Sequence, residues 1–124
     1  MKQSLSETCY KFFSTLANPT RLAIVELLRD SPRNVTEISQ ILNQEQSMIS
    51  HNLQRLDECR FIFSEQRKKK RFYSLNKETM EPLLKLFTYH SEKYCPTGGK
   101  CLNKNNLQKR KLREASDPLY LAHQ

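Results

Sequence analysis

Apolar residues recur every three or four positions in the first part of the chain, which is the period of an amphipathic helix. Residues 5–16 carry such a stripe, made of Leu5, Cys9, Phe12, Phe13 and Leu16. Asn18-Pro19 interrupts the stripe, and because proline fits the first turn of a helix, we expect a second helix to begin there. This helix is expected to end near Ser31-Pro32, and its apolar face comprises Leu22, Val25 and Leu28.

Two shorter helices are expected next. Asn34 and Glu37 have the spacing of a capping box, and Asn43 marks a helix end. Between them lies a short apolar stripe, made of Ile38, Ile41 and Leu42. A fourth helix is predicted over residues 47–59, with an inward face of Ile49, Leu53 and Leu56. Two helices separated by about four residues have the spacing of a helix-turn-helix.

The apolar period then changes from that of a helix to that of a strand. Residues 61–63 and 72–73 are aromatic or β-branched and predict two short strands of a hairpin. Between them lies a loop with five consecutive basic residues, namely Arg67, Lys68, Lys69, Lys70 and Arg71. Five like charges repel one another unless a polyanion compensates them, so we favour nucleic-acid binding over a merely solvated loop.

A last helix is expected over residues 80–94, with Thr79 as its N-cap and Pro82 in its first turn. Its apolar stripe is Met80, Leu83, Leu84, Phe87, His90 and Tyr94. The first and last helices are therefore both apolar on one side, and we expect them to pack together across the axis of a homodimer.

The fold class that follows is mainly α with a small β-hairpin, a winged helix-turn-helix that dimerises through its first and last helices. A chain of 124 residues has room for one domain, which we place at residues 1–95, for DNA binding and dimerisation. Residues 96–124 form a basic C-terminal tail that contains cysteine.

The charge of the chain points to a polyanionic partner. Twenty-one Lys and Arg residues against 13 Asp and Glu residues give a net charge of +8. No apolar run approaches the ~20 residues that span a bilayer, and the first ten residues lack the apolar core of a signal peptide. We therefore expect a cytoplasmic protein with no membrane partner.

The outward side of the fourth helix carries polar and basic residues without a carboxylate. These side chains can donate hydrogen bonds to phosphates and to base edges in the major groove of double-stranded DNA. The predicted contacts from this helix and the residue before it are Gln46, Ser47, Ser50, His51, Gln54 and Arg55. The basic run of the hairpin is expected to add phosphate contacts.

These motifs together resemble the ArsR/SmtB family of metal-responsive repressors. The matching segments, in order, are Leu16-Ala17-Asn18-Pro19-Thr20-Arg21-Leu22, Val35-Thr36-Glu37-Ile38, Gln46-Ser47-Met48-Ile49-Ser50-His51-Asn52-Leu53 with Leu56, and Arg71-Phe72-Tyr73-Ser74-Leu75. The resemblance covers about residues 5–94. It implies a dimeric winged helix whose recognition helix is 47–59 and whose terminal helices form the dimer interface. Such regulators often have glycine at the wing tip, where this chain has Lys69.

The residues that could sense a signal are less well defined. The metal ligands that relatives carry on the last helix fall on Lys77, Thr79, His90 and Lys93 here, and only His90 matches. Cys95 and Cys101 flank a Pro-Thr-Gly-Gly-Lys turn that could bring their sulfurs together, and Cys9 could approach as a third thiolate. Three interpretations stay open: a metal or metalloid ion bound by these thiolates, a reversible thiol or disulfide switch, or no sensory role. No cofactor is otherwise indicated. Cys59 has apolar neighbours and is interpreted as a small core residue.

The leading hypothesis is a sequence-specific DNA-binding transcriptional regulator, most simply a repressor. The main alternative is a non-specific architectural DNA-binding protein, in which the basic hairpin and tail dominate. An enzyme is disfavoured because the sequence contains no Gly-rich phosphate loop or conventional nucleophile motif.

Overall fold

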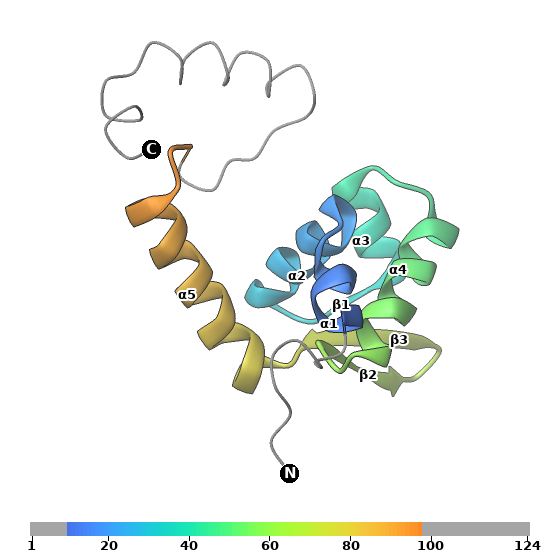
Figure 1. The fold of residues 1–124 in the computed structure, drawn as a ribbon. Helices are drawn as coiled ribbons and strands as arrows, with labels where there is room; N and C mark the ends of the chain where they lie inside the picture. Colours follow the sequence, from blue (N-terminus) through green and yellow to red (C-terminus); the bar gives the residue numbers. More distant parts are fainter. Residues whose placement is uncertain (1–9, 98–124) are drawn as a thin grey trace. The chain divides into compact units, whose positions relative to one another are not determined.

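A computed structural model describes residues 10–97 of the chain (Figure 1). Its elements, in chain order, are α1 (Tyr10–Leu16), α2 (Pro19–Asp30), β1 (Arg33–Asn34), α3 (Val35–Leu42), α4 (Gln46–Glu58), β2 (Ile62–Arg67), β3 (Lys70–Leu75) and α5 (Lys77–Tyr94). The chain divides into two compact units whose boundary follows Pro82, inside α5. Within residues 10–97, no helix is long and apolar enough to cross a membrane.

The helix starts predicted for α2 and α3 are confirmed by their caps. Asn18 Oδ1 accepts a hydrogen bond of 3.1 Å from the backbone N–H of Arg21, and Pro19 lies in the first turn of α2. At α3 the capping box is complete. The Glu37 N–H donates to Asn34 Oδ1 at 2.9 Å, and the Asn34 N–H donates to Glu37 Oε1 at 3.3 Å. Both helices therefore begin where their sequences indicate.

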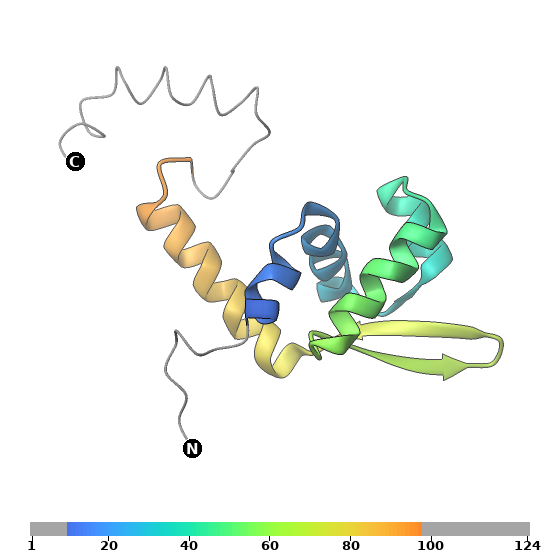
Figure 2. The ribbon, with the colours of Figure 1, turned by 45° about the vertical axis from the view of Figure 1, so that its right-hand side comes forward.

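The core lies between the helices of the first unit and one face of its sheet. Helices α2 and α4 pack against β3 and β2, respectively, as the two ribbon views show (Figures 1 and 2). The apolar side chains that are at most 2% exposed are Ile24, Val25, Leu28, Ile38, Ile49, Leu53, Leu56, Phe61, Ile62 and Met80. Leu22 was expected on the inner face of α2 but is 46% exposed.

The sheet has three antiparallel strands in the order β1-β3-β2. The two-residue strand β1 pairs with β3 through Arg33 and Tyr73, and the sequence analysis did not predict it, because two residues are too few to show a period. Strands β2 and β3 are also longer than predicted. Arg67 pairs with Lys70, so only Lys68 and Lys69 form the turn, and the expected five-residue basic loop is wrong. The outer half of this hairpin extends beyond the core (Figure 2), so its residues show no apolar alternation.

The ends of the chain's outer helices also differ from expectation. Helix α5 begins at Lys77 and not at Met80, because the Met80 N–H already donates to the Asn76 carbonyl at 2.9 Å. Thr79 is therefore not the N-cap, and Pro82 lies in the helix interior rather than in its first turn. Helix α1 is described from Tyr10 to Leu16, and residues 5–9 of the predicted first helix lie outside the described residues.

Candidate nucleic-acid interface

The turn between α3 and α4 sets the start of α4. Asn43 ends α3 in the left-handed conformation, with φ of 53° and ψ of 51°. The Gln44 N–H then donates to the Ser39 carbonyl at 3.1 Å, and the Ser39 hydroxyl donates to the Gln44 carbonyl. Gln44 also shares a hydrogen bond of 3.3 Å with Thr20 of α2. This turn is therefore held by hydrogen bonds to α3 and to α2.

Helix α4 separates an apolar side from a polar side as predicted. Its inward residues Ile49, Leu53 and Leu56 are fully buried. The six predicted DNA contacts on this helix are all exposed, namely Gln46, Ser47, Ser50, His51, Gln54 and Arg55. Helix α4 begins at Gln46, one residue earlier than expected, so Gln46 belongs to the helix itself.

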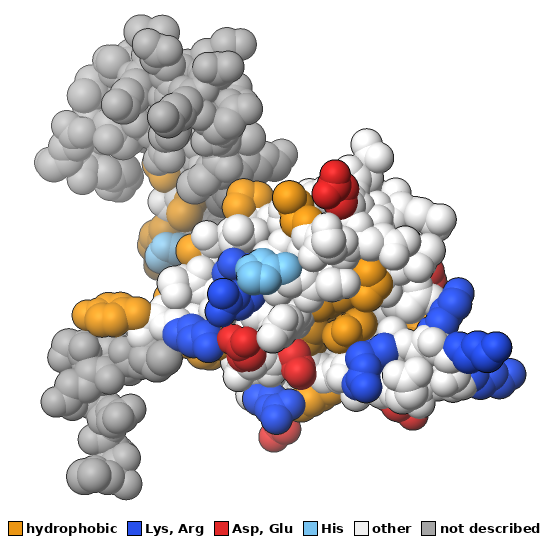
Figure 3. Space-filling view, turned by 90° about the vertical axis from the view of Figure 1, so that its right-hand side faces the viewer, with side chains coloured by type: hydrophobic (Ala, Val, Ile, Leu, Met, Phe, Trp, Pro, Cys, Tyr) orange, Lys and Arg blue, Asp and Glu red, His pale blue; other side chains and the backbone are white. Residues whose placement is uncertain are grey.

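The hairpin, the wing of the fold, concentrates positive charge at its tip. All five residues from Arg67 to Arg71 are exposed. On the face of the molecule drawn in Figure 3, Lys and Arg side chains gather in one part. Of the carboxylates that the structure describes, none forms an ion pair with Lys68, Lys69 or Lys70. A pocket of about 450 Å³ lies at the tip, lined by Arg67, Lys68, Lys69, Lys70 and Phe72. Within the described part of the chain, no carboxylate therefore neutralises the tip lysines.

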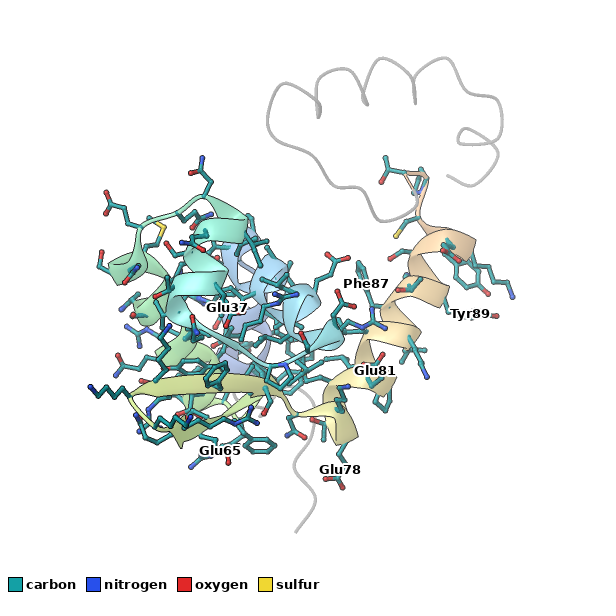
Figure 4. The ribbon with its side chains drawn as sticks, turned by 180° about the vertical axis from the view of Figure 1, so that it is seen from behind. Glu37, Glu65, Glu78, Glu81, Phe87 and Tyr89 are labelled. Carbon is teal, nitrogen blue, oxygen red and sulfur yellow. The ribbon has the colours of Figure 1, made fainter. Side chains whose placement is uncertain are left out.

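Arg67 and Arg71 are engaged within the hairpin itself. The Arg67 guanidinium lies 5.2 Å from the centre of the Phe72 ring and donates two hydrogen bonds, of 3.2 and 3.3 Å, to Glu65 Oε2. Figure 4 shows Glu65 on this hairpin. Arg71 Nη1 donates to Ser64 Oγ at 2.9 Å. The five basic residues are therefore not equivalent: two brace the strands, and the three lysines are the freer cations.

Near the C-terminal end of α4, Glu58 forms ion pairs with two basic residues. Glu58 Oε2 lies 2.9 Å from Lys11 Nζ and 3.7 Å from Arg55 Nη1. The hydrogen bond from Lys11 holds the pKa of Glu58 below its ordinary value, and the same hydrogen bond raises the pKa of Lys11. Arg55, a predicted DNA contact, is thus shared with a carboxylate in the free protein.

A part-buried polar contact beneath α4 was missed by the sequence analysis. Arg21 Nε donates to Asn52 Oδ1 at 2.9 Å, and Arg21 Nη1 donates to the Thr15 carbonyl at 3.0 Å. The clue in the sequence was Asn52, a polar residue in the inward row of an otherwise apolar helix face.

The cysteines do not form a described site. Cys95 is half-buried just after α5, while Cys9 and Cys101 lie outside the described residues. Within residues 10–97, no three His, Cys, Asp or Glu side chains are grouped so that they could hold a metal ion. Cys59 is only half-buried, and its Sγ lies 3.4 Å from Thr15 Oγ1, so it is not simply a core residue. His90 is exposed, and its ring lies 5.4 Å from that of Tyr94.

Comparison with known proteins places these features in context. Residues 18–64 match the family described as bacterial regulatory protein, arsR family. The HTH-type transcriptional regulator NmtR of Mycobacterium tuberculosis is 35% identical over 77 residues, which cover 62% of this chain and 64% of NmtR. The chain thus spans just under two thirds of the length of that relative.

Solved structures show the same fold. The transcriptional repressor BigR from Xylella fastidiosa is 25% identical with a TM-score of 0.57, over 64% of this chain and 81% of BigR. The homodimeric winged helix-turn-helix DNA-binding domain of Mb0332 from Mycobacterium bovis is 23% identical with a TM-score of 0.66, over 76% of this chain and 92% of that domain. The predicted fold class, a winged helix-turn-helix, is confirmed.

Proposed function

We propose that the chain is a member of the arsR family of bacterial regulatory proteins, whose family pattern matches residues 18–64, and that it is a sequence-specific DNA-binding transcriptional regulator that represses as a homodimer. One observation carries this proposal. The exposed side of α4 has no carboxylate from Gln46 to Arg55, and the same unit carries three lysines at the hairpin tip that form no ion pair with any carboxylate of residues 10–97. Short polar side chains suit base edges, and lysines suit phosphates.

Repression is the direction of regulation that we propose. BigR, which has the same fold, is a transcriptional repressor. A protein that binds its DNA site tightly can exclude other proteins from that site without any further contact. Loss of operator binding would then switch the regulated gene on.

Homodimerisation is supported by large apolar side chains that are exposed on α1 and on α5. On α1, Phe13 is 56% exposed and Phe12 is 37% exposed. On α5, Phe87 is 58% exposed and Tyr94 is 63% exposed. All four belong to the stripes predicted to face a second subunit, and the Mb0332 domain is homodimeric. Met80 is an exception, because its side chain is buried in the first unit.

We further propose that the thiols of Cys95, Cys101 and Cys9 regulate DNA binding. Cys95 follows α5 directly, with its N–H donating to the Ser91 carbonyl at 3.1 Å, so a change at this thiol can act on the end of that helix. Two chemistries are open, namely coordination of a metal or metalloid ion by the thiolates, and a disulfide whose two electrons and two protons pass to peroxide.

The thiol proposal is tested by operator affinity under reducing, peroxide-treated and Zn²⁺-loaded conditions. Wild type and the double variant Cys95→Ser, Cys101→Ser are compared. A coupling of the usual size changes affinity roughly 5–150-fold in the wild type and leaves the double variant unchanged. Constant wild-type affinity under all three conditions contradicts a sensory role for these thiols.

The DNA-binding proposal is tested by selecting duplexes from a random library with the full chain, followed by gel-shift competition at one salt concentration. A regulator keeps its selected duplex in the presence of excess random DNA. An architectural protein, the alternative function, loses the selected duplex in proportion to the competitor added, and that result contradicts the proposal.

A further inference from the structure

We infer that Arg21 is a positioning residue that fixes the orientation of the recognition helix α4 relative to α1, an inference that rests on the proposed function. Arg21 lies in the first turn of α2 and is half-buried. Its Nε donates to Asn52 Oδ1 on α4 at 2.9 Å, and its Nη1 donates to the Thr15 carbonyl on α1 at 3.0 Å. One guanidinium group therefore joins three helices.

The contact on α4 is part-buried and has a defined geometry. Asn52 is 7% exposed and lies on the inward side of α4, beside the fully buried Leu53. Its Nδ2 donates to the Met48 carbonyl one turn earlier at 3.0 Å, which turns Oδ1 toward Arg21. A buried amide needs both partners, so Asn52 serves the attachment of α4 and not DNA contact.

The contact on α1 is made at a helix end. The Thr15 carbonyl belongs to the last turn of α1, where carbonyl groups lack partners within the helix. Arg21 supplies one such partner. Two further contacts join α1 to the C-terminal end of α4. Thr15 Oγ1 lies 3.4 Å from Sγ of Cys59, the residue that follows α4, and Lys11 Nζ lies 2.9 Å from Glu58 Oε2. Helix α1 is thus tied to α4 near its middle through Arg21 and directly at its C-terminal end.

The hydrogen bonds of Arg21 fix the orientation of α4, which apolar packing alone does not. The buried leucine and isoleucine side chains hold α4 against the core, but hydrophobic contacts are non-directional and permit small rotations. Hydrogen bonds from a planar guanidinium are directional, and a lysine cannot reproduce them. Base reading needs a fixed orientation of His51 and Gln54, whereas phosphate contacts from the hairpin lysines do not. Arg21 is therefore expected to affect specificity without affecting general DNA affinity.

The experiment compares Arg21→Gln and Asn52→Leu with a matched control, Arg29→Gln, in the full chain. Arg29 is also a half-buried arginine of α2, but its guanidinium pairs with Glu81 at 2.7 Å. Two quantities are measured for each variant. The first is amide hydrogen exchange of residues 46–58 in the free protein, and the second is the ratio of affinities for the selected and a scrambled duplex at fixed salt.

Arg21→Gln and Asn52→Leu are expected to speed exchange in the first half of α4 about tenfold and to lower the affinity ratio about tenfold or more, with affinity for scrambled DNA little changed. Arg29→Gln changes neither quantity. Asn52→Asp keeps an acceptor for Arg21 and should retain most of the affinity ratio.

Unchanged exchange of α4 in Arg21→Gln, or an equal increase in Arg29→Gln, overturns the positioning role. A lower affinity ratio without faster exchange also overturns it, because Arg21 would then act on DNA itself. If wild type binds both duplexes equally, the proposed function fails, and the exchange result alone decides whether Arg21 positions α4.

Discussion

The outward side of α4 and the tip of the hairpin are two exposed surfaces whose side chains differ in what they can recognise. On α4, His51 and Gln54 are short, exposed side chains with donors and acceptors that fit base edges. At the hairpin tip, Lys69 and Lys70 are long cations with no described carboxylate partner. Base contacts carry sequence information and phosphate contacts carry general affinity, so substitutions on the two surfaces should have different effects.

Replacing His51 or Gln54 with alanine should weaken operator binding by ~1–3 kcal/mol and leave random-DNA binding nearly unchanged. Neutralising Lys69 and Lys70 with glutamine should weaken the binding of operator and random DNA alike. It should also reduce the slope of log affinity against log salt concentration by about one for each phosphate contact that is lost. Fluorescence anisotropy across a salt series measures the operator affinity, the random-DNA affinity and the salt dependence of each variant. Equal effects of the two kinds of variant on operator and random DNA would contradict this division.

Glu58 introduces a pH dependence at the end of α4. Its folded-state pKa is lowered by the hydrogen bond from Lys11, so its contribution to stability is complete above the ordinary glutamate pKa of about 4.3. This contribution is lost as pH falls through the lowered folded-state pKa. Urea unfolding of wild type and Lys11→Gln should therefore show a stability difference near neutral pH that disappears once the pH has fallen below the lowered folded-state pKa of Glu58. The pair is exposed and its effect is small; a difference that persists at low pH would contradict its electrostatic origin.

Individual contacts between distant residues were beyond the reach of the sequence pattern. The exposed side of α4 follows from helical periodicity alone, and all six of its predicted members are exposed. Arg21 and Asn52 are 31 positions apart, and only the packing of α2 against α4 reveals that they meet. Similarly, the basic run predicts charge at the hairpin, but it does not predict that Arg67 is held by Glu65 and Phe72.

Among the helices and strands, the capping box predicted the start of α3 correctly, whereas the predicted N-cap Thr79 did not mark the start of α5. Asn34 and Glu37 form the predicted capping box because the two hydrogen bonds depend only on residues three apart. The hairpin and the start of α5 were harder to predict. Strands β2 and β3 continue through polar residues because backbone pairing needs no apolar side chain. Helix α5 starts early because its first turn bonds to Asn76 before the apolar stripe begins.

Asn34→Ala should lower the free energy of unfolding by about 1 kcal/mol, because the first turn of α3 loses its cap. Asn43→Gly is the matched control. Asn43 holds φ of 53°, a left-handed conformation that glycine adopts without strain, so this substitution should be neutral or slightly stabilising. Chemical denaturation of both variants measures the difference. A similar loss for both would mean that the capping hydrogen bonds do not stabilise α3.

Assembly determines whether two recognition helices can act together on DNA. The exposed aromatic residues of α1 and α5 are too large and too numerous to be explained as isolated surface side chains. A homodimer would cover them and would hold two copies of α4 at a fixed separation. Half-sites about one helical turn apart, ~34 Å, would then match that separation.

Helix α5 offers a matched pair of variants to test the dimer. Phe87 and Tyr89 are 58% and 56% exposed and project from different sides of α5 (Figure 4). Only Phe87 belongs to the predicted dimer stripe. Phe87→Glu should convert a particle of about twice 14.7 kDa into a monomer, whereas Tyr89→Glu should leave the dimer intact. Sedimentation equilibrium measures both masses. A wild-type monomer, or dissociation by both variants alike, contradicts the assignment of this interface.

The most direct measurement is the affinity of the wild-type chain for three duplexes at one salt concentration: the selected sequence, the same sequence with about half a helical turn inserted between its half-sites, and a scrambled sequence. A dimeric sequence-specific regulator should bind the selected duplex ~10³-fold or more tightly than the scrambled one. The insertion should remove most of that preference, because the two recognition helices then face opposite sides of the DNA. Equal affinity for all three duplexes would contradict sequence-specific regulation by this protein.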